Sequence, residues 1–373
     1  MDKSVTKYFT IAVFIAVLAG FFILNRVIVP PAILESERRP PADSPAITWK
    51  NFSSDSFMTD FDEWAQDSFA LRENLRALRA HMVFNVFRQT DKEGLYTGDS
   101  GAGKIQKIDE AAWQQTIAKV NRMEERIRER DSNIYMAVIP DKSLYAGRYL
   151  PGYDAETARK IIEEELSPII AAIDLTEALA AGDFYKTDLH WSQPMTGGVM
   201  AALGEAMGFE YEQLSTDHIV NTAGEFKGGY AGQVALPMDE EKMEYVLNKY
   251  IDSSDAFYLD PGTAAMRPGK VYYPEALAGG GDPYDFFLNG PQPVIVLETP
   301  QKDSGRTLYL FRDSFGSSLA PLFLGAYDKV VLIDLRYIDS RVLTEYVDFG
   351  SGQDVLFIYS SQILGSPGSL LVS

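Results

Sequence analysis

Hydrophobic and polar positions divide the chain into three kinds of pattern. Residues 8–24 form an uncharged apolar run, near the lower limit of length for a membrane-spanning helix. From Phe57 to Arg88, apolar residues recur at helical spacing, which predicts a long amphipathic helix. Downstream, short apolar runs alternate with helical patterns, and this alternation predicts an α/β fold with a mainly parallel sheet flanked by helices.

The individual elements of the α/β part follow from these runs. The predicted strands are Ile134–Ile139, Ile169–Ile173, Val294–Leu297, Thr307–Phe311, Val330–Ile333 and Val355–Tyr359. The predicted helices are Asp109–Arg130, Glu156–Leu166, Pro194–Met207 and Phe315–Leu324. Between about residues 209 and 292, Gly, Pro, Tyr and Asp become frequent, and the strands read as short and antiparallel. We therefore expect a β-rich insertion in this region.

The patterns predict four successive segments. Residues 1–29 are expected to form a membrane anchor, and residues 30–50 a proline-rich, extended linker. Residues 51–105 are predicted to form a helical segment packed on the core. Residues 106–373 are predicted to form the α/β domain, which contains the insertion at 209–292.

The charges around the first apolar run bear on its topology. Lys3 and Lys7 precede the run and Arg26 ends it, but Arg38 and Arg39 lie close on the other side, so the positive-inside rule gives a weak signal. No Ala-x-Ala cleavage site follows the run, which favours an uncleaved anchor over a signal peptide. Because the anchor is N-terminal and no further span follows, we expect the globular part to be extracytoplasmic.

Composition excludes several classes of function. The chain has 34 Lys and Arg against 53 Asp and Glu, a net charge of -19, which argues against a nucleic-acid partner. There is no cysteine, so disulfides and thiol catalysis are excluded. The glycine-rich stretch 94–103 lacks the pattern of a phosphate-binding loop, and no spacing of His and carboxylates suggests a metal. We therefore expect neither a cofactor nor a metal.

One serine stands where nucleophiles often stand. Ser314 follows the predicted strand Thr307–Phe311 and precedes the predicted helix, so its hydroxyl should lie above the end of the sheet. The backbone amide of Phe315, at the start of that helix, is the expected oxyanion donor. A serine needs a base to act as a nucleophile. The alternative is that Asp313 or Ser314 simply caps the helix.

The chain has only three histidines that could serve as the base for Ser314. Asp188 stands two residues before His190, and in an extended segment both side chains would lie on one face. Asp188 could then orient the ring of His190, which would take the serine proton. His81 lies in a helical pattern and His218 in a polar stretch, and neither has this setting. An Asp-x-His pair can also be purely structural.

Other residues near these motifs are candidates for substrate contact. Residues 224–233 form a glycine-rich loop that could supply an amide or a sugar-facing tyrosine, Tyr230, although a plain turn cluster is as good an explanation. Arg312 and Trp191 flank the serine and the histidine. A group of aromatic residues in the insertion could form a carbohydrate platform, but we favour core packing for them: Tyr272, Tyr273, Tyr284, Phe286 and Phe287.

The order Asp-x-His-Trp followed by strand-Asp-Ser-Phe resembles the DHHW proteins and the related AlgX/AlgJ group, which are SGNH-hydrolase-like proteins of polysaccharide O-acetylation. Further similar stretches are residues 35–39, 64–72, 139–142, 313–321 and 334–336. The resemblance implies a circularly permuted SGNH core and a triad of Ser314, His190 and Asp188. Two positions depart from the pattern. Arg312 stands where many relatives have Gly, and Leu189 stands where the naming motif has a second histidine.

The resulting hypothesis is a membrane-anchored, extracytoplasmic serine O-acyltransferase. The resemblance implies acetyl transfer to a surface or secreted polysaccharide, with an MBOAT-type membrane acyltransferase as a possible partner. With water as acceptor, the same triad would make a glycan acetyl-esterase. A rival hypothesis is a non-catalytic polysaccharide-binding or assembly component. A third treats Asp188 and His190 as a structural pair in a scaffold.

Overall fold

A computed structural model describes residues 3–34, 36–37, 39–46, 48, 55–128, 131–147, 150, 152–211, 218–278 and 281–373. The chain divides into two compact units, and each is described by itself. Unit 1 comprises residues 1–89 with 232–237, and unit 2 comprises residues 90–231 and 238–373. The division after Gln89 differs from the predicted boundary at 105, because residues 91–104 form strands that belong to unit 2.

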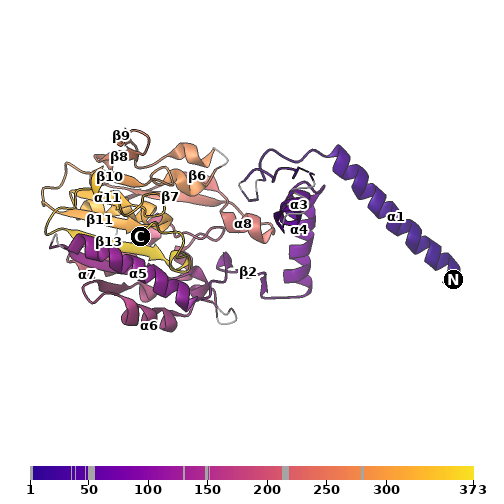
Figure 1. Cartoon of the computed structure of the whole chain (residues 1–373), viewed down its shortest axis with the longest axis horizontal. Helices are drawn as coiled ribbons and strands as arrows, with labels where there is room; N and C mark the ends of the chain where they lie inside the picture. The colour runs from indigo at the N-terminus through magenta and orange to yellow at the C-terminus, as the bar shows by residue number, and fades with distance from the viewer. Residues whose placement is uncertain are drawn as a thin grey trace. The chain divides into compact units, whose positions relative to one another are not determined.

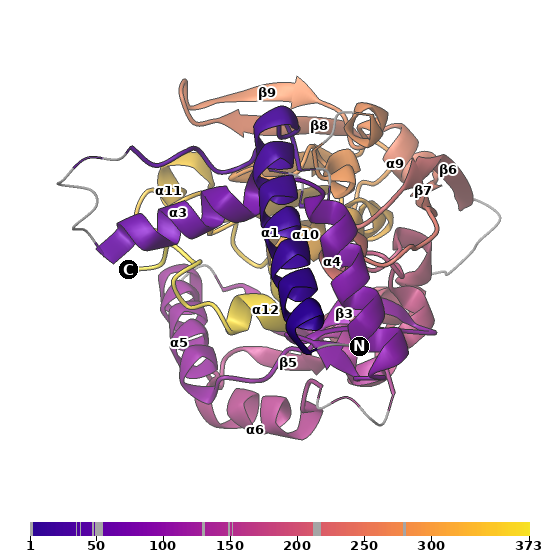
Figure 2. The same ribbon diagram turned by 90° about the vertical axis from the view of Figure 1, so that its right-hand side faces the viewer.

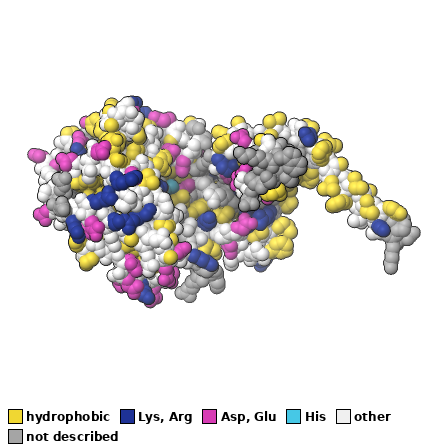
Figure 3. Space-filling view, viewed as in Figure 1, with side chains coloured by type: hydrophobic (Ala, Val, Ile, Leu, Met, Phe, Trp, Pro, Cys, Tyr) yellow, Lys and Arg dark blue, Asp and Glu magenta, His cyan; other side chains and the backbone are white. Residues whose placement is uncertain are grey.

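Unit 1 begins with the apolar helix α1, Lys3–Val27. Residues 6–27 have a mean hydropathy of 2.2 and are long enough to cross a membrane, and a signal sequence near the N-terminus has the same properties. Large apolar side chains along α1 are exposed, among them Phe9, Phe14 and Phe22. Figure 3 shows apolar side chains covering this helix.

The single helix predicted from Phe57 to Arg88 is wrong. The structure has α3, Asp55–Asp67, and α4, Arg72–His81, followed by a turn of π-helix, Met82–Val86. The break falls at Leu71, which has a left-handed backbone with φ of 62°.

Ion pairs surround this break. The Asp67 carboxylate accepts hydrogen bonds from the Arg39 guanidinium, at 2.6 and 2.9 Å, and from the Ala42 amide at 2.8 Å. Arg72 pairs with Glu37. Leu34 and Arg39 form a β-bridge, so the predicted linker turns back on itself there.

Unit 2 is built on an eight-stranded sheet. Its strands are β4 Asn133–Ile139, β5 Ala171–Asp174, β8 Asp255–Asp260, β9 Ala265–Gly269, β10 Val294–Glu298, β11 Thr307–Arg312, β12 Lys329–Ile333 and β13 Asp354–Ser360. The order is β5-β4-β13-β11-β12-β10-β8-β9. The five strands from β5 to β12 run parallel, and β10, β8 and β9 continue the sheet in antiparallel pairs. Figure 1 labels β9, β8, β10, β11 and β13 of this sheet. The predicted mainly parallel α/β sheet is confirmed.

Helices cover both faces of this sheet, and β11 shows why. Its side chains alternate, so Leu308 and Leu310 enter one apolar cluster while Tyr309 and Phe311 enter another. The first cluster includes residues of α7, Gly197–Met207, of α10, Ser314–Leu319, and of the 3₁₀ segment Ala320–Gly325. The second includes residues of α5, Glu110–Ile127, and of α6, Ala155–Glu165. Figure 2 shows α5 beside α6.

Smaller elements complete unit 2. A three-stranded antiparallel sheet holds β1 Asp91–Lys92, β2 Leu95–Gly98 and β3 Gly101–Lys104. The remaining α-helices are α8 Gly229–Val234, which crosses into the segment grouped with unit 1, α9 Lys249–Asp252, α11 Leu343–Tyr346 and α12 Ser361–Leu364. Short 3₁₀ turns occupy Lys142–Tyr145, Thr176–Ala178, Ala181–Asp183, Gln193–Met195, Pro274–Leu277 and Pro283–Phe286.

The insertion is β-rich, as predicted. β6, Ile219–Phe226, pairs antiparallel with β7, Glu241–Leu247, while β8 and β9 extend the main sheet. Its aromatic residues are mostly interior. Tyr284, Phe286 and Phe287 are buried in one cluster with Tyr185, Phe226 and Met243, and Tyr272 packs against it. A carbohydrate platform is therefore wrong for these aromatics, because their rings fill the core.

Candidate active site

Ser314 lies at the carboxyl end of a central parallel strand. It is the first residue of α10, two positions after the end of β11, and is half-buried. The preceding Asp313 caps the helix, because its Oδ1 accepts the Phe315 amide at 3.0 Å. Asp313 Oδ2 accepts the Ser360 amide at 2.8 Å. These two bonds tie the turn at Ser314 to the end of β13, and the predicted strand–turn–helix is confirmed.

His190 lies between Ser314 and Asp188. Its Nε2 is 2.8 Å from Ser314 Oγ, and its Nδ1 is 2.7 Å from Asp188 Oδ1. Only 3% of His190 and 4% of Asp188 is exposed. An Nδ1–H donated to the carboxylate leaves Nε2 free to accept the serine hydroxyl proton. This is the geometry in which an imidazole acts as a base toward a serine.

The Asp188–His190 pair arises from a bend and not from the extended segment that we expected. Residues 186–190 form a bend, in which Asp188 Oδ1 also accepts the His190 amide at 3.1 Å. This is an Asx-type turn. The Glu241 carboxylate holds the bend from outside. It accepts the amides of Lys186 and Thr187, each at 2.7 Å, and the Thr187 hydroxyl at 2.5 Å.

The glycine-rich loop supplies amides to this bend and not to a substrate. Gly229 N–H donates to Asp188 Oδ2 at 2.9 Å, and Gly228 N–H donates to Thr187 Oγ1 at 2.8 Å. A Cβ on Gly228 would lie 2.3 Å from both Asp188 Cβ and the Thr187 carbonyl oxygen. Only glycine permits this approach. Tyr230 is buried, with its amide on the Thr187 carbonyl at 2.9 Å, so it does not face a sugar.

Hydrogen bonds within the bend keep Asp188 ionised. Burial raises the pKa of the Asp188 carboxyl, but hydrogen bonds from His190 and the Gly229 amide outweigh burial and lower that pKa below its ordinary value. Lys142 is buried nearby, and its ammonium donates to the carbonyls of Ala102, Tyr185 and Asp188 at 2.7–3.0 Å. Burial lowers the pKa of Lys142 to about 8, while nearby carboxylates, Asp188 first, raise it in part.

Tyr284 is a site residue that sequence reasoning missed. Its ring stacks on the His190 ring, with centroids 3.7 Å apart and planes 6° from parallel. The Tyr284 hydroxyl donates to Ser318 Oγ at 2.6 Å, and Trp191 Nε1 donates to the same oxygen at 2.8 Å. Phe315 contacts the other side of this group, with its ring 4.8 Å from that of His190. The imidazole is thereby held by aromatic rings. The only signal in the sequence was the abundance of aromatics in the insertion.

The structure contradicts three further predictions about substrate contact. The Phe315 amide is already bonded to Asp313, because Asp313 is the helix cap, and so it is not a free oxyanion donor. Trp191 is fully buried and bonded to Ser318. Arg312 is 1% exposed, because the last residue of β11 points into the interior.

The interior position of Arg312 has an electrostatic consequence. Its Nη1 lies 3.3 Å from the fully buried Asp334 carboxylate. Burial lowers the pKa of the Arg312 guanidinium, and Asp334 opposes that shift. A charge paired in this way does not reach a substrate above Ser314.

The other two histidines have different partners. His81 Nδ1 is bonded to Asn85 Nδ2 on one turn of helix in unit 1. His218 lies beside Tyr211, with ring centroids 5.8 Å apart. Within the described part of the chain, His and carboxylate side chains form no group suited to a metal ion.

Comparison with solved structures yields relatives of the same fold. A DHHW family protein from Eubacterium siraeum DSM 15702 superposes with a TM-score of 0.60 at 19% identity, over 76% of this chain and 97% of that one. Bacillus cereus PatB1 gives 0.57 at 19% identity, over 72% and 96%. PatB1 with a sulfonyl adduct gives 0.58 at 18% identity, over 72% and 95%.

These relatives settle the fold. The predicted SGNH-like architecture and the resemblance to DHHW proteins are confirmed at the level of the fold. The O-acetyltransferase domain of Pseudomonas putida AlgJ gives a TM-score of 0.41 at 12% identity, over 74% of this chain and 93% of that one, which is too weak to support an argument. No protein-family model and no curated protein matches the chain in sequence.

Proposed function

We propose that this protein is a serine-dependent O-acetyltransferase that modifies a polysaccharide. The observation that carries the proposal is the unbroken hydrogen-bond chain from Ser314 through His190 to Asp188. A half-exposed serine, a buried base and a buried orienting carboxylate are the parts that acyl transfer requires. The fold shared with the DHHW protein and with PatB1, which has been solved with a sulfonyl adduct, is consistent with this chemistry.

The reaction would proceed in two balanced steps. Ser314 Oγ attacks the acetyl carbonyl of the donor while its proton passes to His190 Nε2. The tetrahedral intermediate collapses, the donor's oxygen leaves with that proton, and acetyl-Ser314 remains. A glycan hydroxyl then attacks the acetyl carbon, His190 takes its proton, and Ser314 leaves and is reprotonated. Asp188 stabilises the imidazolium in both steps.

The expected oxyanion donor is engaged within the protein. The Phe315 amide is bonded to Asp313, so either it exchanges partners when the donor binds or another group serves. Water in place of the glycan hydroxyl would give an acetyl-esterase with the same triad. The proposed setting is extracytoplasmic, with α1 as a membrane anchor and an MBOAT-type acyltransferase as the source of acetyl groups.

Hydrolysis of p-nitrophenyl acetate by the full chain in detergent tests the triad. Ser314→Ala and His190→Ala should each lower kcat/KM on the order of 10⁴-fold or more. Ser351→Ala and His81→Ala, which alter an exposed serine and an exposed histidine of unit 1, should leave it unchanged. Equal turnover by all five proteins would refute the proposal.

Two further readouts separate the remaining possibilities. A sulfonyl fluoride should label the wild-type chain once, at Ser314, and should leave Ser314→Ala unlabelled, which tests the nucleophile without knowledge of the natural donor. Acetyl groups recovered on an added polysaccharide would identify a transferase. Free acetate alone, with the polysaccharide unmodified, would identify an esterase.

A further inference from the structure

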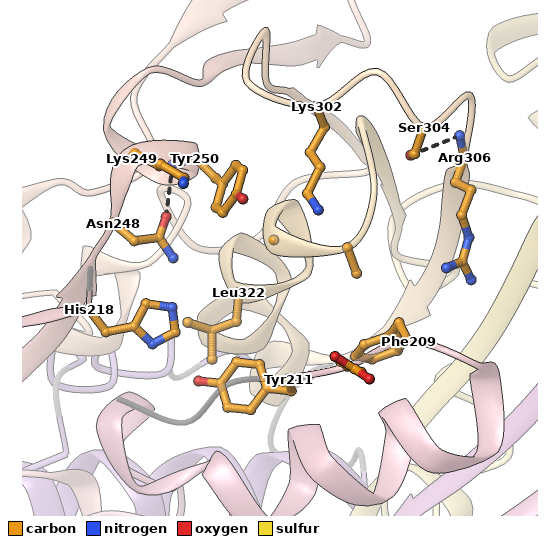
Figure 4. A pocket seen from close by; sticks show the side chains of 13 residues that line it. Phe209, Tyr211, His218, Asn248, Lys249, Tyr250, Lys302, Ser304, Arg306 and Leu322 are labelled. Atoms are coloured by element: carbon orange, nitrogen blue, oxygen red, sulfur yellow. Dashed lines mark hydrogen bonds between the residues drawn. The ribbon is translucent and has the colours of Figure 1, made fainter. Parts of the chain in front are cut away.

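Lys142 is a buried, charged residue to which the triad mechanism gives no role. Only 5% of it is exposed, and it opens the 3₁₀ turn Lys142–Tyr145 that follows β4. Lysine usually keeps its ammonium group in water and is almost never fully buried unless it is paired. Lys302, by contrast, reaches into a cavity of about 490 Å³ in the same unit (Figure 4). The interior position of Lys142 is therefore unusual for its residue type.

The place of Lys142 in the fold puts it at the edge of the sheet where Ser314 lies. The strands β4, β13 and β11 are neighbours and run parallel, so their carboxyl ends share one edge of the sheet. Lys142 follows β4, and Ser314 follows β11. The lysine is therefore at the same edge as the nucleophile, two strands away from it.

The Lys142 ammonium uses its hydrogen bonds on backbone carbonyls. It donates to the carbonyl of Ala102 at 2.8 Å, of Tyr185 at 2.7 Å and of Asp188 at 3.0 Å. A lysine ammonium has three N–H groups, so none is left for a substrate. Ala102 belongs to β3, whereas Tyr185 and Asp188 belong to the segment that carries the bend. The lysine thus joins β3, this segment and the end of β4.

Two of these carbonyls belong to the loop that carries the histidine of the triad. The Tyr185 amide donates to the His190 carbonyl at 3.0 Å, and this bond closes the loop. Lys142 is bonded both to the first residue of the loop and to Asp188 within it. A shift of the loop would move the His190 ring, whose Nε2 is 2.8 Å from Ser314 Oγ. The distance between base and nucleophile therefore depends on how firmly the loop is held.

Several ionisable side chains lie around the ammonium. They are the carboxylates of Asp188, Glu241 and Asp141, and the phenols of Tyr185 and Tyr230, of which the Tyr230 ring has its centre 5.9 Å from Nζ. Burial raises the pKa of both phenols, so they stay neutral while the lysine titrates. Burial lowers the pKa of Lys142 to about 8, and the three carboxylates oppose that shift. A neutral amine would have two N–H groups for three carbonyls.

We propose that Lys142 is a positioning residue for the triad, and that its charged ammonium holds the loop that carries Asp188 and His190. The inference rests on the proposed acyl transfer and adds to it a residue that contacts no reacting atom. Because Lys142 acts through the loop, its loss should lower kcat and leave KM nearly unchanged. Because only the charged form makes all three bonds, turnover should also fall when alkaline pH removes the proton.

The first test compares two lysines whose ammonium groups both hold backbone carbonyls. Lys119 Nζ donates to the carbonyls of Pro367 at 2.6 Å and Leu370 at 2.7 Å, and neither belongs to the bend. Lys142→Gln and Lys119→Gln are assayed as full chains in detergent with p-nitrophenyl acetate, and the turnover of Ser314→Ala is subtracted. Lys142→Gln should lower kcat on the order of 10²-fold, as a displacement of about 1 Å does, with KM within about twofold of wild type. Lys119→Gln should change neither constant by more than about twofold.

The second test follows the same Ser314-dependent turnover from about pH 7 to about pH 10. The wild type and Lys119→Gln should lose turnover at about pH 8, where Lys142 loses its proton, while circular dichroism shows both proteins still folded. Lys142→Gln has no charge to lose, so its low turnover should not fall further in this range. Lys142→Arg stays charged, so it should recover part of kcat and should also lack the alkaline fall.

Three results would overturn the inference. A wild-type profile that stays flat to about pH 10 would show that the charge of Lys142 is not needed. Equal losses of kcat in Lys142→Gln and Lys119→Gln would show a general loss of stability. An alkaline fall that persists in Lys142→Gln and Lys142→Arg would belong to another group. If Lys142→Gln does not fold, the wild-type and Lys142→Arg profiles decide in the same way.

The subtraction of Ser314→Ala also separates this inference from the proposed function. Ser314-dependent turnover that is equal in the wild type and Lys142→Gln would remove this inference and leave the acyl transfer standing. A wild type that turns over no faster than Ser314→Ala would remove the acyl transfer, and the role of Lys142 with it.

Discussion

A single methyl group at Gly228 should disable the triad although none of its three members is replaced. The Cβ of Gly228→Ala would lie 2.3 Å from Asp188 Cβ and from the Thr187 carbonyl oxygen. Ordinary carbon contacts begin at about 3.5 Å, so the loop and the bend must separate by roughly 1 Å. The Gly229 N–H bond to Asp188 Oδ2, 2.9 Å in the wild type, would then be broken or badly stretched.

Two costs follow from this separation. Overpacking a tight site costs about 1–3 kcal/mol, and a lost hydrogen bond to a charged group costs about 1.5–3 kcal/mol. Because the loop can relax outward, we expect a net destabilisation of about 2–4 kcal/mol. A displacement of about 1 Å in a catalytic group lowers turnover on the order of 10²-fold. Activity should therefore fall much further than the folded fraction.

The assay is p-nitrophenyl acetate hydrolysis beside thermal unfolding, with Gly182→Ala as the matched control. Gly182 has open space where a Cβ would be, so that variant should keep both stability and kcat/KM. A folded Gly228→Ala protein with turnover within about threefold of wild type would refute the reasoning. So would an equal loss in Gly182→Ala, because the damage would then not come from the contact with Asp188.

Three other perturbations probe the support of the triad. Tyr284→Phe keeps the ring stacked on His190 and should lower kcat for the same ester by no more than a few-fold. Tyr284→Leu removes a stack worth about 0.5–1.5 kcal/mol and should lower kcat roughly 2- to 10-fold. Glu241→Gln leaves an amide nitrogen against the donors of Thr187 and should lower both Tm and kcat, as calorimetry and kinetics would show, unlike Glu244→Gln on the same strand. Because folding lowers the pKa of Asp188 from its ordinary value of 3.8, the ionised carboxylate stabilises the fold above pH 3.8. That stability is lost as the pH falls below 3.8. Acid titration of Asp188→Asn should therefore show a smaller loss of stability in this range, and identical titration curves would contradict the assignment.

Much of the fold and the nucleophile turn could be read from local sequence. Thr307–Phe311 is an apolar run followed by Asp313, and a run of that type with a capping residue predicts a strand that turns into a helix. The parallel sheet followed from the alternation of such runs. The insertion also followed from a local change in composition.

The environment of His190 could not be read in the same way. The spacing of Asp188 and His190 predicts a pair on an extended segment, but the pairing comes from a bend held by Glu241, which is distant in sequence. The stacking of Tyr284 on His190 likewise depends on how the insertion folds back.

The type of a residue also did not indicate whether its side chain is buried. Arg312, Trp191 and Tyr230 carry groups that can bind a substrate, yet all three are interior. Their side chains find partners within the protein, such as Asp334 for Arg312 and Ser318 for Trp191. A polar or aromatic residue beside a motif is placed by tertiary contacts, and these are not encoded in its neighbours.

The place of β13 in the sheet has a consequence for how the protein folds. In chain order β13 is the last strand of the sheet, yet it pairs with β4 on one side, with Asp354 opposite Asn133, and with β11 on the other. Until β13 is inserted, β4 and β11 present unpaired edges and the Ser360 amide is not there to hold Asp313. Such long-range pairing slows folding and leaves intermediates prone to aggregation. The nucleophile turn should therefore be among the last parts of the molecule to reach its native form.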